Sequence, residues 1–229
     1  MERARAWERI RRQAWSLRVL RRTAPIGDNW GWDRGTPVDR FYIETFLDRH
    51  RRDIHGRVLE VKDASYTRRF GSGVTKSDVL DIDRANAEAT TYADLAAADA
   101  IPSDAYDCVI VTQTLQFVLD VRAALGHLHR MLAPEGVLLA SVPTVSRVLP
   151  PGSEDGTDYW RFTPAVCASL FGAEFGAENV LVEPLGNVLA GVAFLHGLAA
   201  EELPATKLER HDPEFPLLVA VRAVKRGEA

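Results

Sequence analysis

The sequence predicts an α/β protein with a doubly wound parallel sheet. Short apolar runs alternate with stretches of helical periodicity from residue 56 to the end of the chain, and this alternation is typical of repeated strand–helix units. The run "YDCVIVTQ" at residues 106–113 is apolar almost throughout, as expected of a parallel strand covered by helices on both faces. The chain has 229 residues, of which 46% are hydrophobic. We therefore expect one globular unit over residues 56–229, preceded by an N-terminal helical extension over residues 1–55.

The expected elements follow one another without an internal repeat or a low-complexity linker. Pro37 favours the start of a helix with Thr36 as its N-cap, and an apolar face carries this helix to about Asp53. Beyond it we expect strands at 57–61, 74–78, 90–93 and 106–113, a helix at 121–132, a turn at 134–136, a strand at 137–143, a polar loop at 144–158, a helix from 163, a strand at 179–184, a helix at 187–203 and a strand at 215–224.

The charge of the chain is unevenly distributed. The first 22 residues hold eight Arg and two Glu, a net charge of +6, while the whole chain carries −4, so the remainder carries −10. Trp7, Ile10, Ala14 and Leu17 recur at helical spacing, which predicts a basic amphipathic helix. We expect this helix to pack on the domain, with contact to an anionic membrane surface or a phosphorylated substrate as the alternative. The acidic remainder argues against a nucleic-acid partner.

Composition also bears on the compartment. The chain has no apolar run long enough to span a membrane and no apolar signal-peptide core. Its two cysteines, Cys108 and Cys167, lie within apolar or helical patterns, which suits buried thiols in a reducing compartment. These features predict a cytoplasmic protein. The Cys and His spacings match no zinc site, and we expect no metal.

Polar residues gather where the predicted parallel strands end. Ligands of such sheets bind outside the carboxyl ends of the strands, and Thr112 and Gln113 end the fourth strand. Asp78 ends the predicted second strand, 18 residues after Glu60, which is the position of a carboxylate that binds a ribose diol. Asp94, after the third strand, could accept a hydrogen bond from an adenine amino group, and the neighbouring Leu95 offers a backbone amide. The sequence therefore predicts an adenosine-binding surface.

Residues 106–143, "YDCVIVTQTLQFVLDVRAALGHLHRMLAPEGVLLASVP", resemble the middle of a class I S-adenosylmethionine-dependent methyltransferase of the methyltransferase type 11-like group. This resemblance implies a Rossmann-like, seven-stranded sheet of order 3-2-1-4-5-7-6 with strand 7 antiparallel. It also implies S-adenosylmethionine as the cofactor. The stretches "WGWDRGTPVDRFYIETFL", "LEVKDASYTRRFG", "DYWRFT" and "NVLAGVAFLHGLAAEEL" are similar to small methyltransferase-like proteins of bacterial polysaccharide and natural-product gene sets. That similarity implies a small saccharide or natural-product acceptor, methylated on a hydroxyl or an amine.

The sequence departs from the family at the turn after the first strand, where Lys62, Ala64 and Tyr66 occupy the places of three glycines. One account has Lys62 pointing away while Gly71 and Gly73 supply flexibility later in the loop. A second account is that the protein has lost the cofactor, which would leave a methyltransferase-fold protein without methyl transfer. Such a protein could be a cyclase or isomerase, or a non-catalytic partner of a biosynthetic enzyme.

The remaining account replaces the glycine amides by charge. Lys62 and Arg68 would then neutralise the carboxylate of the cofactor, because a charge-assisted hydrogen bond is stronger than a neutral one. We expect Asp63 to accept from loop amides or to pair with Arg68, and thereby to organise the loop without glycines. Glu60 and Gly71 complete the expected cofactor site.

The acceptor side of the site is predicted from polar and aromatic residues further along the chain. His196 is the candidate general base, with a structural histidine on a helix face shared by Leu189 and Val192 as the alternative. The candidate substrate-binding residues are Gln116, Tyr159, Trp160 and Arg161, because aromatic faces and an arginine fork can hold a sugar ring and an anion. Core packing of Trp160 and Phe162 is the competing interpretation. Four charged residues could close the site from the N-terminal side or form paired surface ions: Asp33, Arg34, Asp39 and Arg40.

Overall fold

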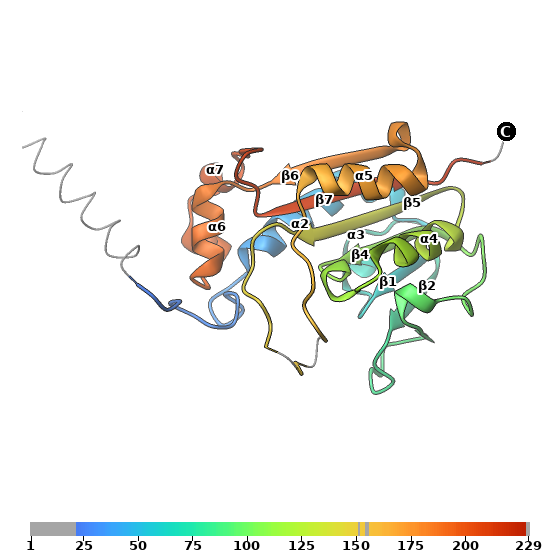
Figure 1. Ribbon diagram of the computed structural model, residues 1–229, viewed down its shortest axis with the longest axis horizontal. Coiled ribbons are helices and arrows are strands. Elements are labelled where there is room, and N and C mark those ends of the chain that lie inside the picture. Colours follow the sequence, from blue (N-terminus) through green and yellow to red (C-terminus); the bar gives the residue numbers. More distant parts are fainter. Residues whose placement is uncertain (1–21, 151, 154–155, 228–229) are drawn as a thin grey trace, which may run out of the picture.

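The computed structural model describes residues 22–150, 152–153 and 156–227. The basic helix expected within the first 21 residues lies outside this part of the chain. The described residues form a seven-stranded sheet of order β3-β2-β1-β4-β5-β7-β6. β7 runs antiparallel to both of its neighbours, and the other pairs are parallel. The predicted fold class and strand order are therefore confirmed (Figure 1).

The elements run in the expected sequence, with some shifted boundaries. The first half holds α2 (Val38–Arg49), β1 (Gly56–Val61), α3 (Ser65–Phe70), β2 (Val74–Asp81), β3 (Thr91–Tyr92), the 3-10 turn η2 (Leu95–Ala97), β4 (Tyr106–Thr112), η3 (Leu115–Phe117) and α4 (Val121–Met131). The second half holds β5 (Leu132–Pro143), α5 (Pro164–Phe175), β6 (Val180–Leu185), α6 (Val188–Leu195), η5 (Ala200–Glu202), α7 (Ala205–Leu208) and β7 (Leu218–Val224). Two further 3-10 turns are η1 (Arg51–Asp53) and η4 (Ala177–Asn179). Within the described residues, no helix is both long and apolar enough to cross a membrane.

Several boundaries differ from the prediction: β5 begins at Leu132 and includes the expected turn at 134–136, β3 is limited to Thr91–Tyr92, and β7 begins at Leu218. Three other differences have local reasons. Pro37, rather than Thr36, occupies the N-cap position of α2. β2 continues to Asp81 because Val79 and Leu80 are buried and extend the pairing with β1. The helix predicted to Leu203 ends at Leu195, because Gly197 adopts a φ of 69° and breaks the helical path.

Helices cover both faces of the sheet (Figure 1). On one face α4 and α5 bury Leu125, Leu128 and Phe171 against the strands. On the other face α2 and α6 bury Tyr42, Phe46 and Phe194. α2 therefore contributes to the same core as the strands that follow it. Caps fix where these helices begin: Asp120 accepts from the Ala123 amide at α4, and Thr163 accepts from the Val166 amide at α5.

The N-terminal strap, residues 25–37, is tied to residues 196–202 by hydrogen bonds. The amides of Ile26 and Gly27 both donate to the His196 carbonyl at 3.0 Å, and the Ala200 amide donates to the Thr36 carbonyl at 2.7 Å. The two segments approach so closely that a side chain at Gly197 would meet the carbonyl of Gly27. Figure 1 shows the strap (blue) with α6 and α7 at the end of the molecule toward which the β5 arrow points. The strap and α6 therefore stand beside the carboxyl edge of the parallel strands.

Candidate cofactor and substrate site

Glu60, the acid near the end of β1, organises the turn that follows. It is 2% exposed, and its Oε1 accepts from the Tyr66 amide at 3.0 Å. Its Oε2 accepts from the Thr67 amide and the Thr67 hydroxyl, both at 2.7 Å. The carboxylate thus caps the N-terminus of α3. Glu60 was predicted to bind the cofactor, but the structure directs its carboxylate to the protein's own loop.

Lys62 adopts a backbone conformation that glycine favours. Its φ is 80°, in the left-handed region that disfavours residues with a Cβ. Its amide donates to the Leu80 carbonyl at 2.9 Å, and its carbonyl accepts from Asn86 Nδ2 at 2.6 Å. These two bonds attach the turn to the end of β2. The loop therefore follows a glycine-like path while presenting a lysine.

The rest of the loop agrees with the prediction in part. Asp63 Oδ1 accepts from the Ser65 amide at 2.7 Å, so the expected bond to a loop amide is confirmed. Arg68 instead pairs with Glu88 at 3.1 Å, on an exposed part of the surface. Gly71 ends α3 at the opposite edge of the sheet, where the next residue donates to the Ile54 carbonyl that precedes β1. Of the two alternatives for Asp63, the bond to a loop amide is the one that forms. Arg68, expected to face the cofactor carboxylate, pairs with Glu88 instead, and Gly71 lies away from the expected cofactor site.

The acid at the end of β2 is Asp81 rather than Asp78. Asp78 is buried inside the strand, where it accepts from the Tyr106 hydroxyl at 3.2 Å and pairs with Lys76 at 2.7 Å. Asp81 is half-buried at the carboxyl end. Its Oδ2 accepts from Asn86 Nδ2 at 2.6 Å and its Oδ1 from the Asp83 amide at 3.0 Å. Each oxygen keeps a second lone pair that can accept from a ligand.

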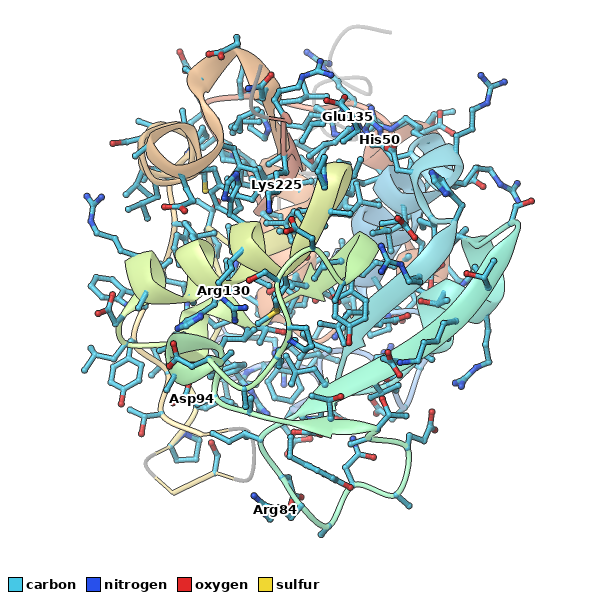
Figure 2. All side chains as sticks on the ribbon, turned by 90° about the vertical axis from the view of Figure 1, so that its right-hand side faces the viewer. His50, Arg84, Asp94, Arg130, Glu135 and Lys225 are labelled. Atoms are coloured by element: carbon cyan, nitrogen blue, oxygen red, sulfur yellow. The ribbon has the colours of Figure 1, made fainter. Side chains whose placement is uncertain are left out.

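Asp94 lies close to where the sequence placed it, two residues beyond the end of β3. Its carboxylate is exposed, and Oδ1 accepts from the Ala96 amide at 2.9 Å while capping η2. The neighbouring Leu95 side chain is buried in the core. Figure 2 shows Asp94 and Arg84 on the side of the sheet formed by β2 and β3, with His50 and Glu135 on the opposite side. Asp81 ends β2 and Asp94 lies just beyond β3, which pairs with β2 in parallel, so both carboxylates stand at the carboxyl edge.

The residues after β4 form a tight polar turn. Thr112 ends the strand, and Gln113 follows in the left-handed region with a φ of 49°. Gln116 is 6% exposed and its Nε2 donates to the Gln113 carbonyl at 2.8 Å. Its Oε1 is buried without a hydrogen-bond partner in the structure. The turn stands at the same edge of the sheet as the loop after β1.

The aromatic residues of the loop after β5 lie beside this turn. The amides of Tyr159 and Trp160 donate to the Gln116 carbonyl at 2.8 and 3.3 Å, and both side chains are exposed. Arg161 makes its hydrogen bonds within the loop. It forms a bidentate ion pair with Asp158 at 2.6 and 2.8 Å and donates to the Arg147 carbonyl. This guanidinium lowers the pKa of Asp158. Arg161 was predicted to bind substrate, but it organises the loop.

His196 lies at the C-terminal end of α6, where its carbonyl receives the two amides of the strap. The side chain is half-buried, and its Nδ1 has no hydrogen-bond partner in the structure. The alternative interpretation placed His196 on a helix face with Leu189 and Val192. The helix ends at Leu195, so His196 follows its last residue and stands at the end of that face.

A cluster of charged residues at the start of α2 stands next to the loop after β1. Arg40 is half-buried, donates to the Tyr66 hydroxyl at 3.1 Å and lies under the Trp32 ring. Burial raises the pKa of the neighbouring Asp39. Arg34 of the strap, by contrast, pairs with Glu202 of η5, and this bond holds the pKa of Glu202 at about 2. The sequence raised Arg40 as a residue that closes the site, but nothing in its spacing indicated the bond to Tyr66.

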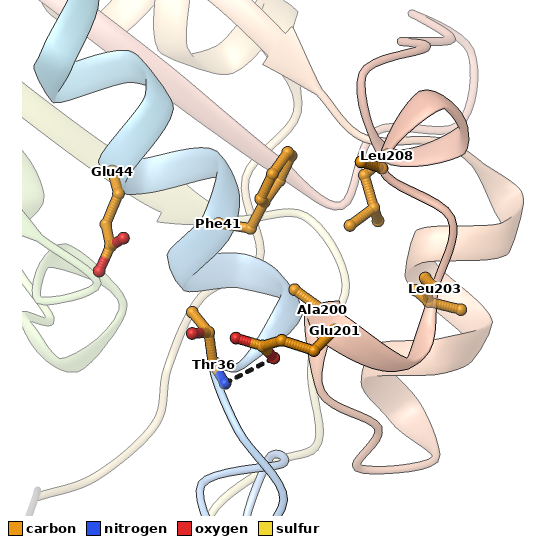
Figure 3. Close-up of a pocket in the computed structure, with 8 residues that line it drawn as sticks. Thr36, Phe41, Glu44, Ala200, Glu201, Leu203 and Leu208 are labelled. Atoms are coloured by element: carbon orange, nitrogen blue, oxygen red, sulfur yellow. Dashed lines mark hydrogen bonds between the residues drawn. The ribbon is translucent and has the colours of Figure 1, made fainter.

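A hollow of about 490 Å³ lies between α2 and the η5–α7 segment (Figure 3). Its walls are mainly apolar, with Phe41, Leu203 and Leu208 among them, and Glu44 and Glu201 contribute carboxylates. Glu44 pairs with Arg69 at 2.6 Å, and Glu201 accepts from the Thr36 amide at 2.9 Å. None of the residues after β1, β2 or β3 lines this hollow.

A family model of a methyltransferase domain matches residues 24–186, and the chain belongs to this family. Solved structures with the same fold include an S-adenosylmethionine-dependent methyltransferase from Archaeoglobus fulgidus, which has a TM-score of 0.53, 12% identity, and coverage of 81% of this chain and 94% of the other. A second such enzyme, from Mesorhizobium loti, has a TM-score of 0.52, 15% identity and coverage of 82% and 98%. The [4+2]-cyclase SpnF has a TM-score of 0.52, 14% identity and coverage of 90% and 88%.

At these identities the likeness to solved structures establishes the fold alone. No curated protein matches the sequence. The family itself implies S-adenosylmethionine binding and methyl transfer to a small molecule.

Proposed function

We propose that the protein transfers a methyl group from S-adenosylmethionine to a hydroxyl or amine of a small saccharide or natural product. The observation that carries this proposal is the pair of carboxylates, Asp81 and Asp94, which follow the adjacent strands β2 and β3 at the carboxyl edge. A carboxylate in the first place suits a ribose diol, and one in the second suits an adenine amino group.

The residues around this pair fit the cofactor by their donor chemistry. Asp81 replaces Asp78 as the proposed ribose-binding residue, and Asp94 with the Leu95 amide remains the proposed adenine contact. Lys62, whose glycine-like backbone brings it to the end of β2, and Arg40 are the cations proposed to face the cofactor carboxylate. Bound S-adenosylmethionine supplies an activated methyl group, so the chain's main task is to align the acceptor.

The acceptor is proposed to lie beyond the β4 turn. Gln113 and Gln116 offer amide groups there, and the exposed rings of Tyr159 and Trp160 can stack on a sugar or an aromatic ring. His196 remains the proposed general base. Its Nδ1 is buried without a hydrogen-bond partner in the structure, so in this role the ring would turn to bring a nitrogen to the acceptor.

Calorimetry with S-adenosylmethionine and S-adenosylhomocysteine tests the cofactor assignment. We expect micromolar binding to the unaltered protein and a loss of about tenfold or more for Asp81→Ala, as is typical of a lost hydrogen bond to a charged group. Asp83→Ala is the matched control, because it removes an exposed carboxylate two residues further on. A folded protein that binds neither compound, or that tolerates Asp81→Ala as well as Asp83→Ala, would refute the assignment.

A second function rests on a specific observation: side chains occupy three positions that carry glycine in the family pattern. Under this alternative the chain uses the methyltransferase fold without methyl transfer, as a cyclase, an isomerase or a partner of a biosynthetic enzyme. The fold shared with the cyclase SpnF is compatible with it. Incubation with methyl-labelled S-adenosylmethionine and a panel of sugars, phenols and amines separates the two, since binding without any labelled product favours the alternative.

A further inference from the structure

Within the described residues, three buried side-chain atoms have no hydrogen-bond partner: Gln116 Oε1, Thr144 Oγ1 and His196 Nδ1. A buried polar atom without a partner destabilises a folded protein, and native structures hold few of them. By contrast, the buried Thr67 hydroxyl donates to Glu60 at 2.7 Å. The unpaired atoms therefore mark a place where the protein gives up stability, which is typical of a functional site.

Gln116 and Thr144 lie at neighbouring strand ends. Gln116 lies in η3, which follows β4, and Thr144 directly follows β5. The two strands pair in parallel, so their ends stand side by side at the carboxyl edge. One short segment bonds to both ends, because the Tyr159 amide donates to the Gln116 carbonyl at 2.8 Å and the Phe162 amide donates to the Pro143 carbonyl at 2.9 Å. The two unpaired atoms therefore belong to adjoining segments beside the proposed acceptor site.

The hydrogen-bond chemistry of these two atoms selects a class of ligand. Gln116 donates through Nε2 to the Gln113 carbonyl, and its remaining Oε1 can only accept, whereas the Thr144 hydroxyl can both donate and accept. A ligand hydroxyl can donate to Oε1 and accept from Thr144. An ionised carboxylate has no proton to donate to Oε1, and an ammonium group cannot accept. The guanidinium of Arg161, further along the same segment, is paired with Asp158. The pair of atoms therefore fits a neutral ligand that carries hydroxyl groups.

On the basis of the methyl transfer proposed above, we propose that Gln116 and Thr144 bind hydroxyl groups of a neutral saccharide acceptor. Thr144 was not among the residues that the sequence indicated. Both atoms are buried in the structure, so the two side chains turn toward the acceptor as it binds. The acceptor then supplies the hydrogen bonds that the protein lacks. A site of this kind discriminates strongly against analogues that leave its polar atoms unpaired.

Thr144→Val tests whether this hydroxyl is unpaired within the protein. Valine removes the hydroxyl at nearly the same shape, so the urea midpoint without acceptor should stay the same or rise. Thr67→Val is the matched control, because its buried hydroxyl is paired with Glu60. Its loss should shift the unfolding equilibrium about fivefold or more toward the unfolded state. If Thr144→Val is destabilised as much as Thr67→Val, the Thr144 hydroxyl is paired and the proposal is wrong.

Saturation-transfer NMR on the protein saturated with S-adenosylhomocysteine tests the class of ligand. The probes are the methyl glycosides of glucose, galactose, mannose and rhamnose, with glucuronate and glucosamine as anionic and cationic counterparts. We expect at least one neutral glycoside to bind about tenfold or more tightly than both charged sugars. Thr144→Val and Gln116→Leu should each lose about tenfold of this affinity. Thr45→Val, which changes an exposed threonine of α2, should bind as the unaltered protein does.

Calorimetry with S-adenosylhomocysteine separates this proposal from the methyltransferase proposal. Thr144→Val and Gln116→Leu should keep the affinity of the unaltered protein, because neither residue is proposed to contact the cofactor. An unaltered protein that binds no S-adenosylhomocysteine would refute methyl transfer, and the sugar comparison would then decide the role of Gln116 and Thr144 by itself. Intact cofactor binding without a preference for a neutral glycoside, or with a preference that Thr144→Val retains, would overturn the proposal for these two residues alone.

Discussion

Replacing Lys62 by glycine and by alanine isolates the strain stored in the turn after β1. Lys62 has a φ of 80°, and the left-handed conformation costs a residue with a Cβ about 1–2 kcal/mol. Both substitutions remove the same side-chain contacts, so these contacts cancel in the comparison. Glycine relieves the strain but loses about 0.4–1 kcal/mol through the greater freedom of the unfolded chain. Lys62→Gly should therefore unfold with a free energy about 0.5–1 kcal/mol larger than that of Lys62→Ala.

Urea denaturation measures this difference directly. The two variants should share the same slope with urea, so the shift in midpoint reports the difference in stability. Ala64, next but one in the turn, has an ordinary φ of −110° and serves as the control, because Ala64→Gly should destabilise. If Lys62→Ala proves as stable as Lys62→Gly, the turn is not strained and the glycine-like interpretation of Lys62 is wrong.

Three further results are expected. Glu60→Gln should destabilise the protein by about 2 kcal/mol or more in urea, because an amide cannot accept all the bonds that the buried carboxylate accepts; a change within about 0.5 kcal/mol, the range of ordinary surface substitutions, would contradict the capping role. Asp78→Asn should lower stability by about 1–2 kcal/mol yet leave S-adenosylhomocysteine affinity unchanged in calorimetry, and weakened binding would return Asp78 to the site. The Arg34–Glu202 pair lowers the pKa of Glu202 from 4.5 to about 2, so the stabilisation that this pair gives is present above pH 4.5 and declines as the pH falls toward 2. The strap should therefore open between pH 4.5 and 2, as monitored by Trp30 fluorescence. In Glu202→Gln this pH dependence should be lost.

The sheet and its order could be predicted because both follow from patterns along the chain. Alternating apolar runs and helical stretches identify the fold class, and the stretch over residues 106–143 identifies the strand order by resemblance. The position of Asp94 just beyond a short strand was predicted for the same reason, while its contact with adenine stays a prediction. Features of the fold that depend on local sequence could therefore be predicted.

The site residues that were misplaced depend on contacts between distant segments. Asp78 looked like a strand end, but its strand continues through Val79 and Leu80, and Tyr106 receives its carboxylate. The sequence made Arg161 a candidate for binding a substrate anion, but its guanidinium pairs with the Asp158 carboxylate. A carboxylate's partner is set by the three-dimensional fold, and the spacing of a motif does not reveal whether that partner is a ligand or another part of the protein.

The bonds of the strap also constrain the order in which the molecule can be completed during synthesis. Residues 25–37 leave the ribosome before strands β1 to β5, whereas their partners at 196–202 emerge after them. Because contacts this far apart in sequence form late, the strap must wait unpaired while strands β1 to β5 and the helices between them are made. The carboxyl edge of the sheet therefore stays uncovered on the nascent chain, and a small molecule could reach it before the strap closes beside α6.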